Sequence, residues 1–141
     1  PLGSLTRAQF LLVFSGTARE WPELINLADC PTCPSGSIHL WNYPEGEDPQ
    51  DALASLLPEG VRRPYAYISP NPQHMLEAIA AGLAGIGFLP RRWADETVKI
   101  VELPEFSAEE LRFPILALST GEPQGALRAW LACIQQSVSN Q

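Results

Sequence analysis

Apolar side chains occur in short runs along this chain, and the first run predicts a strand. Residues 10–14 are continuously apolar and are closed by Ser15 and Gly16, which is typical of a buried strand. The following residues, 17–36, are rich in proline and glycine. They predict an irregular connection with at most one helical turn, near residues 21–27.

A second strand is predicted where apolar positions alternate. In residues 37–41, Ile38 and Leu40 fall on one face while His39 and Trp41 fall on the other. A strand places successive side chains on opposite faces, so this alternation predicts a half-buried strand.

Two helices are predicted in the middle of the chain. Asp48 followed by Pro49 is a capping residue followed by proline at the first helical position, and Pro58 ends the same helix. Asn71 and Pro72 begin the second helix in the same way. Each helix has an apolar stripe, formed by Ala52, Leu53, Leu56 and Leu57 in the first and by Met75, Leu76, Ile79, Ala80 and Leu83 in the second.

The second helix lies between two predicted strands, residues 65–68 and residues 85–90. This order predicts a βαβ unit with parallel strands and a right-handed crossover. Gly82, Gly85 and Gly87 follow the helix, which is the wrong order for a phosphate-binding loop between strand and helix. These glycines indicate a helix end and close packing.

The last third of the chain repeats the mixed pattern. The predicted elements are a short helix at 91–95, a strand at 98–101, a capped turn at 107–110, a strand at 113–118 and a helix at 123–137. The whole pattern predicts an α/β fold with a mixed, mostly parallel sheet flanked by helices.

Composition excludes two classes of partner for this segment. The net charge of −7 with only nine Lys and Arg residues leaves little to neutralise phosphates, so we expect no binding to nucleic acid or to an anionic membrane. No apolar stretch approaches the roughly 20 residues of a membrane-spanning helix. Residues 1–4 resemble the remnant of a cleaved tag, so we expect residues 5–141 to form the natural domain.

Three cysteines are present, Cys30, Cys33 and Cys133. An odd count without a secretory signal argues against a disulfide framework and for a reducing cytoplasm. Cys30 and Cys33 also have the spacing of a thiol redox pair or of half a zinc site. The prolines around them indicate a loop, so we expect neither a metal nor a cofactor, and a small thiol oxidoreductase stays open as an alternative.

Motifs for hydrolysis or acid–base catalysis are absent from the sequence, which contains neither Gly-x-Ser-x-Gly nor His-Glu-x-x-His. The two histidines fit simpler roles, His74 as a solvated residue of a helical first turn and His39 as a cross-strand packing partner. We therefore expect no enzymatic activity.

Residues 75–90, MLEAIAAGLAGIGFLP, resemble the hallmark of the effector-binding domain of LysR-type transcriptional regulators, with one residue more between the glycines. Residues 10–15, 26–29, 114–118 and 126–134 resemble further segments of that domain. The resemblance implies a periplasmic-binding-protein-like subdomain, mainly the second one with the C-terminal helix. The helix-turn-helix and the first effector subdomain would then be absent from this chain.

The same resemblance implies a function. Members sense a small-molecule effector, assemble into homo-oligomers in the cytoplasm and bind DNA only through the N-terminal domain. A solute-binding domain outside transcription is the alternative from another class.

In this family the effector binds in the cleft between two subdomains. The matching positions here lie in residues 40–44 and 69–71, and the candidate effector-binding residues are Trp41, Asn42, Tyr43, Ser69 and Asn71. Amides at the start of the helix after Asn71 can receive an anion, while Trp41 and Tyr43 offer apolar walls with polar tips. The alternative is that Asn71 only caps a helix and Trp41 only fills the core.

Overall fold

The computed structural model describes residues 2–28, 30–61, 65–82, 84–112 and 121–139. Its elements, in chain order, are α1 (Arg7–Phe14), η1 (Trp21–Glu23), β1 (His39–Asn42), α2 (Asp48–Ser55), β2 (Tyr67–Ile68), α3 (Pro72–Ala80), β3 (Gly85–Gly87), η2 (Arg91–Trp93) and α4 (Gly125–Ser139).

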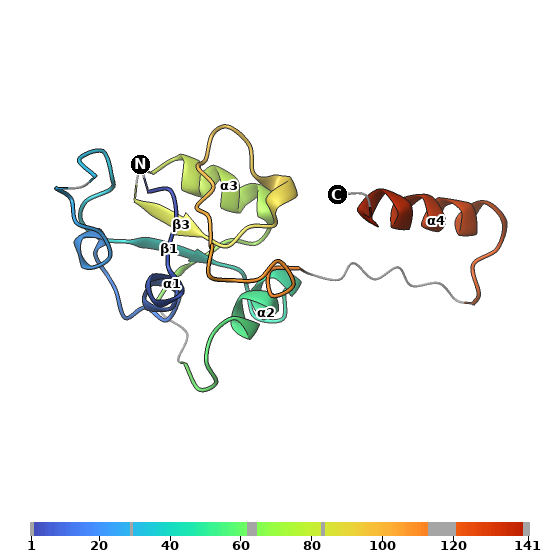
Figure 1. Ribbon diagram of the computed structural model, residues 1–141, viewed down its shortest axis with the longest axis horizontal. Helices are drawn as coiled ribbons and strands as arrows, with labels where there is room; N and C mark the ends of the chain where they lie inside the picture. Colours follow the sequence, from blue (N-terminus) through green and yellow to red (C-terminus); the bar gives the residue numbers. More distant parts are fainter. Residues whose placement is uncertain (1, 29, 62–64, 83, 113–120, 140–141) are drawn as a thin grey trace.

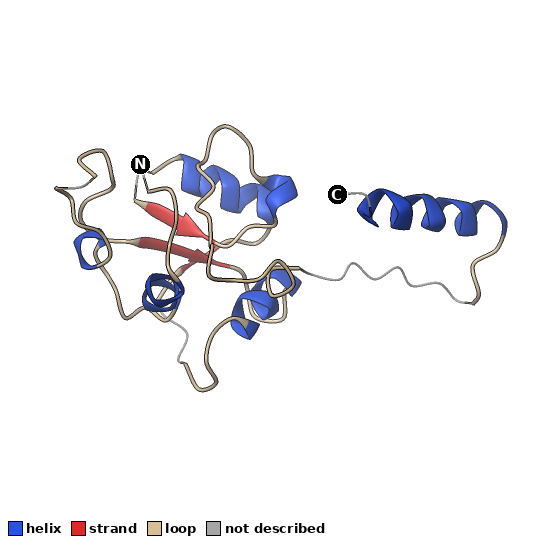
Figure 2. Cartoon of the chain, in the orientation of Figure 1, coloured by secondary structure: helices blue, strands red, loops and turns tan. Residues whose placement is uncertain are grey.

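A three-stranded parallel sheet organises the fold, with strand order β2-β1-β3. Helix α3 lies on one face of the sheet, and α1 and α2 lie on the other (Figures 1 and 2). The predicted α/β class with a parallel sheet and flanking helices is confirmed. The strands of the predicted βαβ unit are also parallel, but they lie on either side of β1 rather than next to each other.

The predicted strand at residues 10–14 is wrong, because this segment belongs to α1. Thr6 and Gln9 form a capping box that satisfies the first free amides of the helix. Phe10, Val13 and Phe14 then lie on one helical face and are buried. A short apolar run cannot by itself separate a strand from a helix, and the capping box upstream agrees with the helix.

The predicted strand at residues 98–101 is also wrong. The described chain forms there only an isolated parallel bridge one residue later, between Ser4 and Glu102. Two hydrogen bonds of 3.0 Å make this bridge, from Leu5 N to Glu102 O and from Glu102 N to Gly3 O. Only one residue of this segment, Glu102, therefore pairs with another part of the backbone, and a single bridge does not make a strand. The strand predicted at 113–118 lies outside the described residues.

Close packing of α3 on β3 depends on two glycines. A Cβ on Gly87 would lie 2.6 Å from Sδ of Met75, and one on Gly85 would lie 3.3 Å from the Cα of Ile79. Met75 is fully buried in this contact. The prediction that these glycines serve close packing is confirmed.

The main hydrophobic core lies on the opposite face, between the sheet, α1 and α2. Phe10 and Leu53 are almost fully buried there together with Leu40 of β1. Phe106, from the segment after the sheet, stacks edge-on against Phe10 with ring centroids 4.9 Å apart. Burial of these side chains supplies the main driving force for folding this layer.

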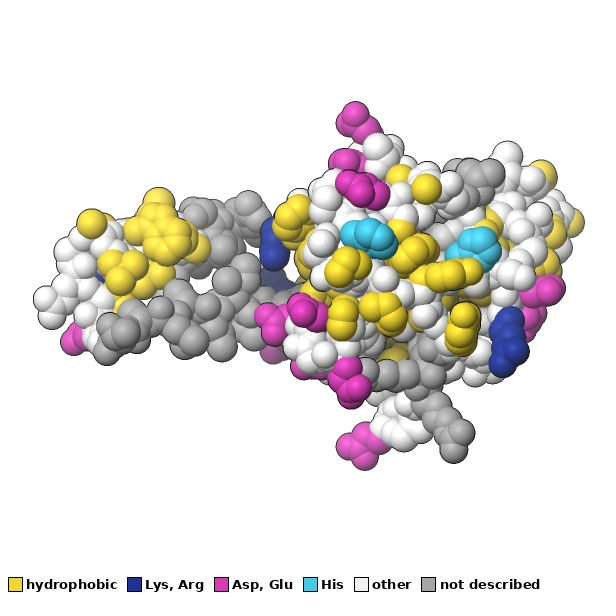
Figure 3. Space-filling view, turned by 180° about the vertical axis from the view of Figure 1, so that it is seen from behind, with side chains coloured by type: hydrophobic (Ala, Val, Ile, Leu, Met, Phe, Trp, Pro, Cys, Tyr) yellow, Lys and Arg dark blue, Asp and Glu magenta, His cyan; other side chains and the backbone are white. Residues whose placement is uncertain are grey.

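Helix α4 confirms the predicted C-terminal helix and stands apart from the rest of the molecule in Figure 1. Leu127, Trp130 and Ile134 form an exposed apolar stripe along it (Figure 3). Among the described residues, no helix has the length and apolar character needed to cross a bilayer.

Candidate functional site

The carboxyl ends of β1 and β2 bring two of the predicted site residues together. Asn42 ends β1 and is in register with Ile68, the last residue of β2. Ser69 follows directly, and its backbone N–H donates a 2.8 Å hydrogen bond to the carbonyl oxygen of Asn42. Ligands of open parallel sheets bind outside these carboxyl ends, so this edge is the candidate site.

The start of α3 forms the second part of this edge. Asn71 is the N-cap, and its side-chain oxygen accepts the backbone N–H of His74 at 2.9 Å. The hydroxyl of Ser69, which is fully buried, donates to the carbonyl oxygen of Asn71 at 2.9 Å and lies 3.0 Å from Nδ1 of His74. The capping role of Asn71 is therefore confirmed, and its role toward an effector stays a prediction.

An aromatic surface adjoins this helix start. Trp41 lies against Tyr67 and against His74, with ring centroids 5.0 and 5.8 Å apart, and His39 lies edge-on to Tyr67 at 6.0 Å. Figure 3 shows the two histidines of the chain on one face with hydrophobic side chains between them. Trp41 is half-buried, whereas Tyr67 keeps 48% of its surface exposed. The expectation that His39 packs across strands is confirmed.

The side chain of Asn42 lies on the other face of the sheet from Trp41, as strand alternation requires. There it lines a cavity of about 450 Å³ together with Phe14, Gln50 and Leu53. Asn42 is 6% exposed, and its Oδ1 has no hydrogen-bond partner among the described residues. The five predicted site residues therefore do not form one surface.

Tyr43 occupies the core rather than the wall of an open site. It is 3% exposed, its hydroxyl has no hydrogen-bond partner among the described residues, and burial raises the pKa of that hydroxyl to about 12. Its backbone N–H donates to Oε1 of Gln50 at 3.0 Å.

Sequence reasoning missed Gln50, although a signal was present. Gln50 lies three residues before Leu53, on the apolar face of α2, and is 4% exposed. A polar residue on a buried helical face needs a hydrogen-bond partner, and the backbone of Tyr43 provides it. Gln50 thus connects α2 to the end of β1.

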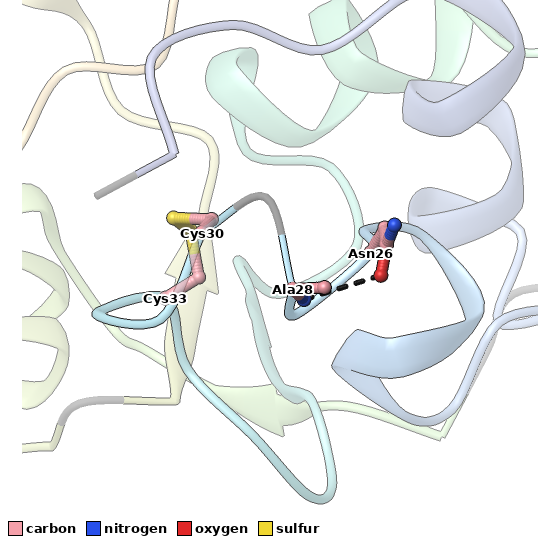
Figure 4. The surroundings of a disulfide bond; sticks show 4 residues. All are labelled: Asn26, Ala28, Cys30 and Cys33. Atoms are coloured by element: carbon pink, nitrogen blue, oxygen red, sulfur yellow. Dashed lines mark hydrogen bonds between the residues drawn. A yellow bond between two sulfur atoms is a disulfide. The ribbon is translucent and has the colours of Figure 1, made fainter.

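Cys30 and Cys33 are joined by a disulfide (Figure 4). The expectation of two unpaired loop cysteines was wrong, because a tight turn, with a 3.0 Å hydrogen bond from Cys33 N to Cys30 O, brings their Cα atoms to 5.3 Å. The side chain of nearby Asn26 accepts the amide of Ala28 at 3.1 Å. The pair lies in a loop, as predicted, and not at the start of a helix.

Metal chemistry has no obvious place in the part of the chain that the structure describes. Within those residues, no group of three or more His, Cys, Asp or Glu side chains could hold a metal ion.

No protein-family model matches the sequence, and no curated protein matches it. Two solved structures share its fold with a TM-score of 0.62 each. One, from Clostridium perfringens, is assigned as a phosphate ABC transporter substrate-binding protein with bound phosphate; it is 17% identical, and the match covers 77% of this chain and 42% of that one. The other is an ABC-type phosphate transport receptor from Vibrio cholerae, 15% identical, with 76% and 43% covered.

At this identity the likeness concerns the fold alone, and the chain spans about two fifths of the length of either structure. Periplasmic binding proteins share this fold with the effector domains of LysR-type regulators. The chain therefore has a periplasmic-binding-protein-like fold.

Proposed function

We propose that this chain is a small-molecule-binding lobe that acts as the sensing module of a LysR-type transcriptional regulator. The fold is compatible with small-molecule sensing. The resemblance of residues 75–90 to the LysR effector domain supports the finer assignment. In this proposal the chain binds an effector and transmits a conformational change, and it catalyses no reaction.

The observation that carries the proposal is the hydrogen bond between Ser69 and Asn42 at the carboxyl edge of the sheet. It holds the ends of β1 and β2 next to the start of α3, where Trp41 adds a half-buried aromatic wall. Trp41 and Asn71 then form one lip of an effector cleft, which the buried Ser69 supports from below. A second lobe would supply the other lip, because small-molecule sites usually enclose most of their ligand.

Signal transmission follows from the cleft geometry. An effector that contacts both lips binds the closed arrangement better than the open one, and this difference in affinity shifts the population of the two states. A DNA-binding domain and a second copy of the chain would respond to that shift. The acidic charge of the chain itself leaves DNA contact to another domain.

A solute-binding domain outside transcription is the second candidate, and two observations favour it. Both similar structures belong to phosphate transport. The Cys30–Cys33 disulfide also fits an oxidising compartment better than the cytoplasm that the regulator assignment implies. Thiol titration of protein taken directly from its native cells separates the candidates, because the regulator should carry reduced cysteines.

The proposal is tested by an amide-shift titration of the 141-residue chain with inorganic phosphate and with benzoate. We expect weak binding, with Kd on the order of millimolar because one lip is present, and coupled shifts in residues 41–43 and 69–74. Gln73→Ala, an exposed change in the same helical turn, serves as the control and should bind as the unchanged chain does. Shifts that leave both segments unmoved while others respond would refute this site.

A further inference from the structure

His74, in the first turn of α3, has one ring nitrogen held from inside the protein. The hydroxyl oxygen of Ser69 lies 2.9 Å from the carbonyl oxygen of Asn71 and 3.0 Å from Nδ1 of His74. Ser69 is fully buried, so its hydroxyl group has to find its hydrogen-bond partners within the protein. These two contacts therefore determine where the protons of this small network lie.

The network fixes the tautomer of the His74 ring. A carbonyl oxygen only accepts hydrogen bonds, so the single hydroxyl proton of Ser69 is donated to Asn71. The oxygen of Ser69 then acts as an acceptor, and Nδ1 of His74 has to supply the proton. The opposite assignment, in which Ser69 donates to Nδ1, would leave two oxygen atoms 2.9 Å apart without a proton between them. The neutral ring is therefore the Nδ1–H tautomer, and its Nε2 is an acceptor.

This acceptor lies at the border of the aromatic surface. Nδ1 faces the buried Ser69, so Nε2 lies on the far side of the ring, on a residue that is exposed. Nε2 has no hydrogen-bond partner among the described residues. The ring stands edge-on to Trp41, with centroids 5.8 Å apart and 65° between the planes. Figure 3 shows hydrophobic side chains beside the histidines on this face. A ligand on the Trp41 surface therefore meets a fixed acceptor at its edge.

We propose that Ser69 is a positioning residue for His74, and that Nε2 of His74 selects effectors with a planar apolar body and an N–H or O–H donor at its edge. The plane of the ligand lies against Trp41, and its donor reaches Nε2. An analogue methylated at the donor atom loses this hydrogen bond and places a methyl group against the nitrogen. The location of the ligand rests on the proposed effector lip, whereas the tautomer of His74 depends on no ligand.

The tautomer is tested on the ligand-free 141-residue chain by long-range proton–nitrogen correlation spectra at pH 8, since protonated and unprotonated ring nitrogens differ widely in chemical shift. We expect Nδ1–H for His74. Ser69→Ala should return the ring to the Nε2–H form that is common for solvated histidines. Asn71→Ala removes the helix cap but keeps the carbonyl group that Ser69 contacts, so it should retain Nδ1–H. An Nε2–H ring in the unchanged chain, or an unchanged tautomer in Ser69→Ala, would overturn the positioning role.

The ligand class is tested by amide-shift titrations with indole and 1-methylindole, which differ in the donor. We expect indole to bind about three- to tenfold more tightly, with saturable shifts in residues 41–43 and 69–74. His74→Phe keeps an aromatic ring without Nε2 and should remove this preference. His39→Phe, the same change at the other exposed histidine, should retain it.

Equal affinities of the unchanged chain for the two indoles, or no binding of either, would overturn the ligand class. Phosphate and benzoate are scored separately at the same residues. If they shift residues 41–43 and 69–74 while indole does not, the effector lip stands and only this inference fails. If none of the four compounds shifts these residues, the proposed lip fails as well, and the tautomer measurement still decides the role of Ser69.

Discussion

Gly87 of β3 and Met75 of α3 are packed so closely that a methyl group on Gly87 would lie 2.6 Å from Sδ of Met75. The same group would lie 3.0 Å from Cδ1 of Ile79 and 3.3 Å from the carbonyl oxygen of Trp41. Helix α3 can therefore approach the sheet only because position 87 has no side chain.

Gly87→Ala should consequently destabilise the fold by about 1 to 3 kcal/mol, as overpacking of a close contact does. Urea unfolding followed by circular dichroism measures this change. Gly82→Ala is the matched control, because a Cβ there meets nothing within 4 Å, and it should change the free energy of unfolding by less than about 0.5 kcal/mol. Equal effects of the two substitutions would contradict the packing account.

Asn71→Ala should remove the cap of α3. The lost hydrogen bond to His74 N costs about 1 kcal/mol of unfolding free energy. Asn71→Ser keeps a capping oxygen and should restore most of the stability. If Asn71 also contacts an effector, Asn71→Ser should bind phosphate or benzoate more weakly than the unchanged chain even though its stability returns. If binding and stability both recover fully, Asn71 serves only as the helix cap.

Tyr43 should make the fold sensitive to alkaline pH. Burial raises its pKa to about 12, above the usual 10, so the folded chain holds the phenol proton more tightly than the unfolded chain does. Below pH 10 the phenol is protonated in both the folded and the unfolded chain, and its contribution to the free energy of unfolding is complete. As the pH rises from 10 to 12, this contribution is lost. The loss amounts to at most about 2 kcal/mol.

Tyr43→Phe provides the test for this titration. The hydroxyl has no hydrogen-bond partner among the described residues, so the variant should be as stable as the unchanged chain at pH 7. Its free energy of unfolding should fall less between pH 10 and 12. Parallel pH profiles for the two proteins would show that Tyr43 does not titrate in this way.

The Cys30–Cys33 disulfide should stabilise the chain modestly, because it closes a very short loop. Chain entropy predicts about 2 kcal/mol for this loop size. Replacing both cysteines by serine should therefore lower the free energy of unfolding by about that amount, and Cys133→Ser, at an exposed position of α4, should not. Thiol counting that finds three reactive thiols in the unreduced chain would refute the bond.

Helix α4 should promote self-association, because Leu127 and Trp130 expose an apolar stripe, 45% and 59% of their surfaces respectively. Sedimentation velocity over a concentration series should show reversible oligomers. Trp130→Lys should shift the population to the monomer, while Gln124→Lys, which adds the same charge outside the stripe, should not. A strictly monomeric chain at high concentration would contradict the expectation.

Local interactions explain why part of this fold could be predicted from the sequence alone. Asn71 and Pro72 define the start of α3 within a few residues, and the alternation at Ile38, His39 and Leu40 identifies β1. Gly85 and Gly87 indicate close packing because no other residue lacks a Cβ. Each of these signals depends on neighbours along the chain or on backbone geometry.

Tertiary structure decided the rest, since the deciding contacts join residues that are distant in sequence. Phe10 lies in a helix and not in a strand because its helical face packs on Phe106 and the sheet. Pairing of β1 with both β2 and β3 aligned Asn42 with Ser69 but sent the side chains of Trp41 and Asn42 to opposite faces. A single cluster of site residues, as inferred from the sequence, thus became two separate surfaces, because neighbouring side chains of a strand cannot share one face.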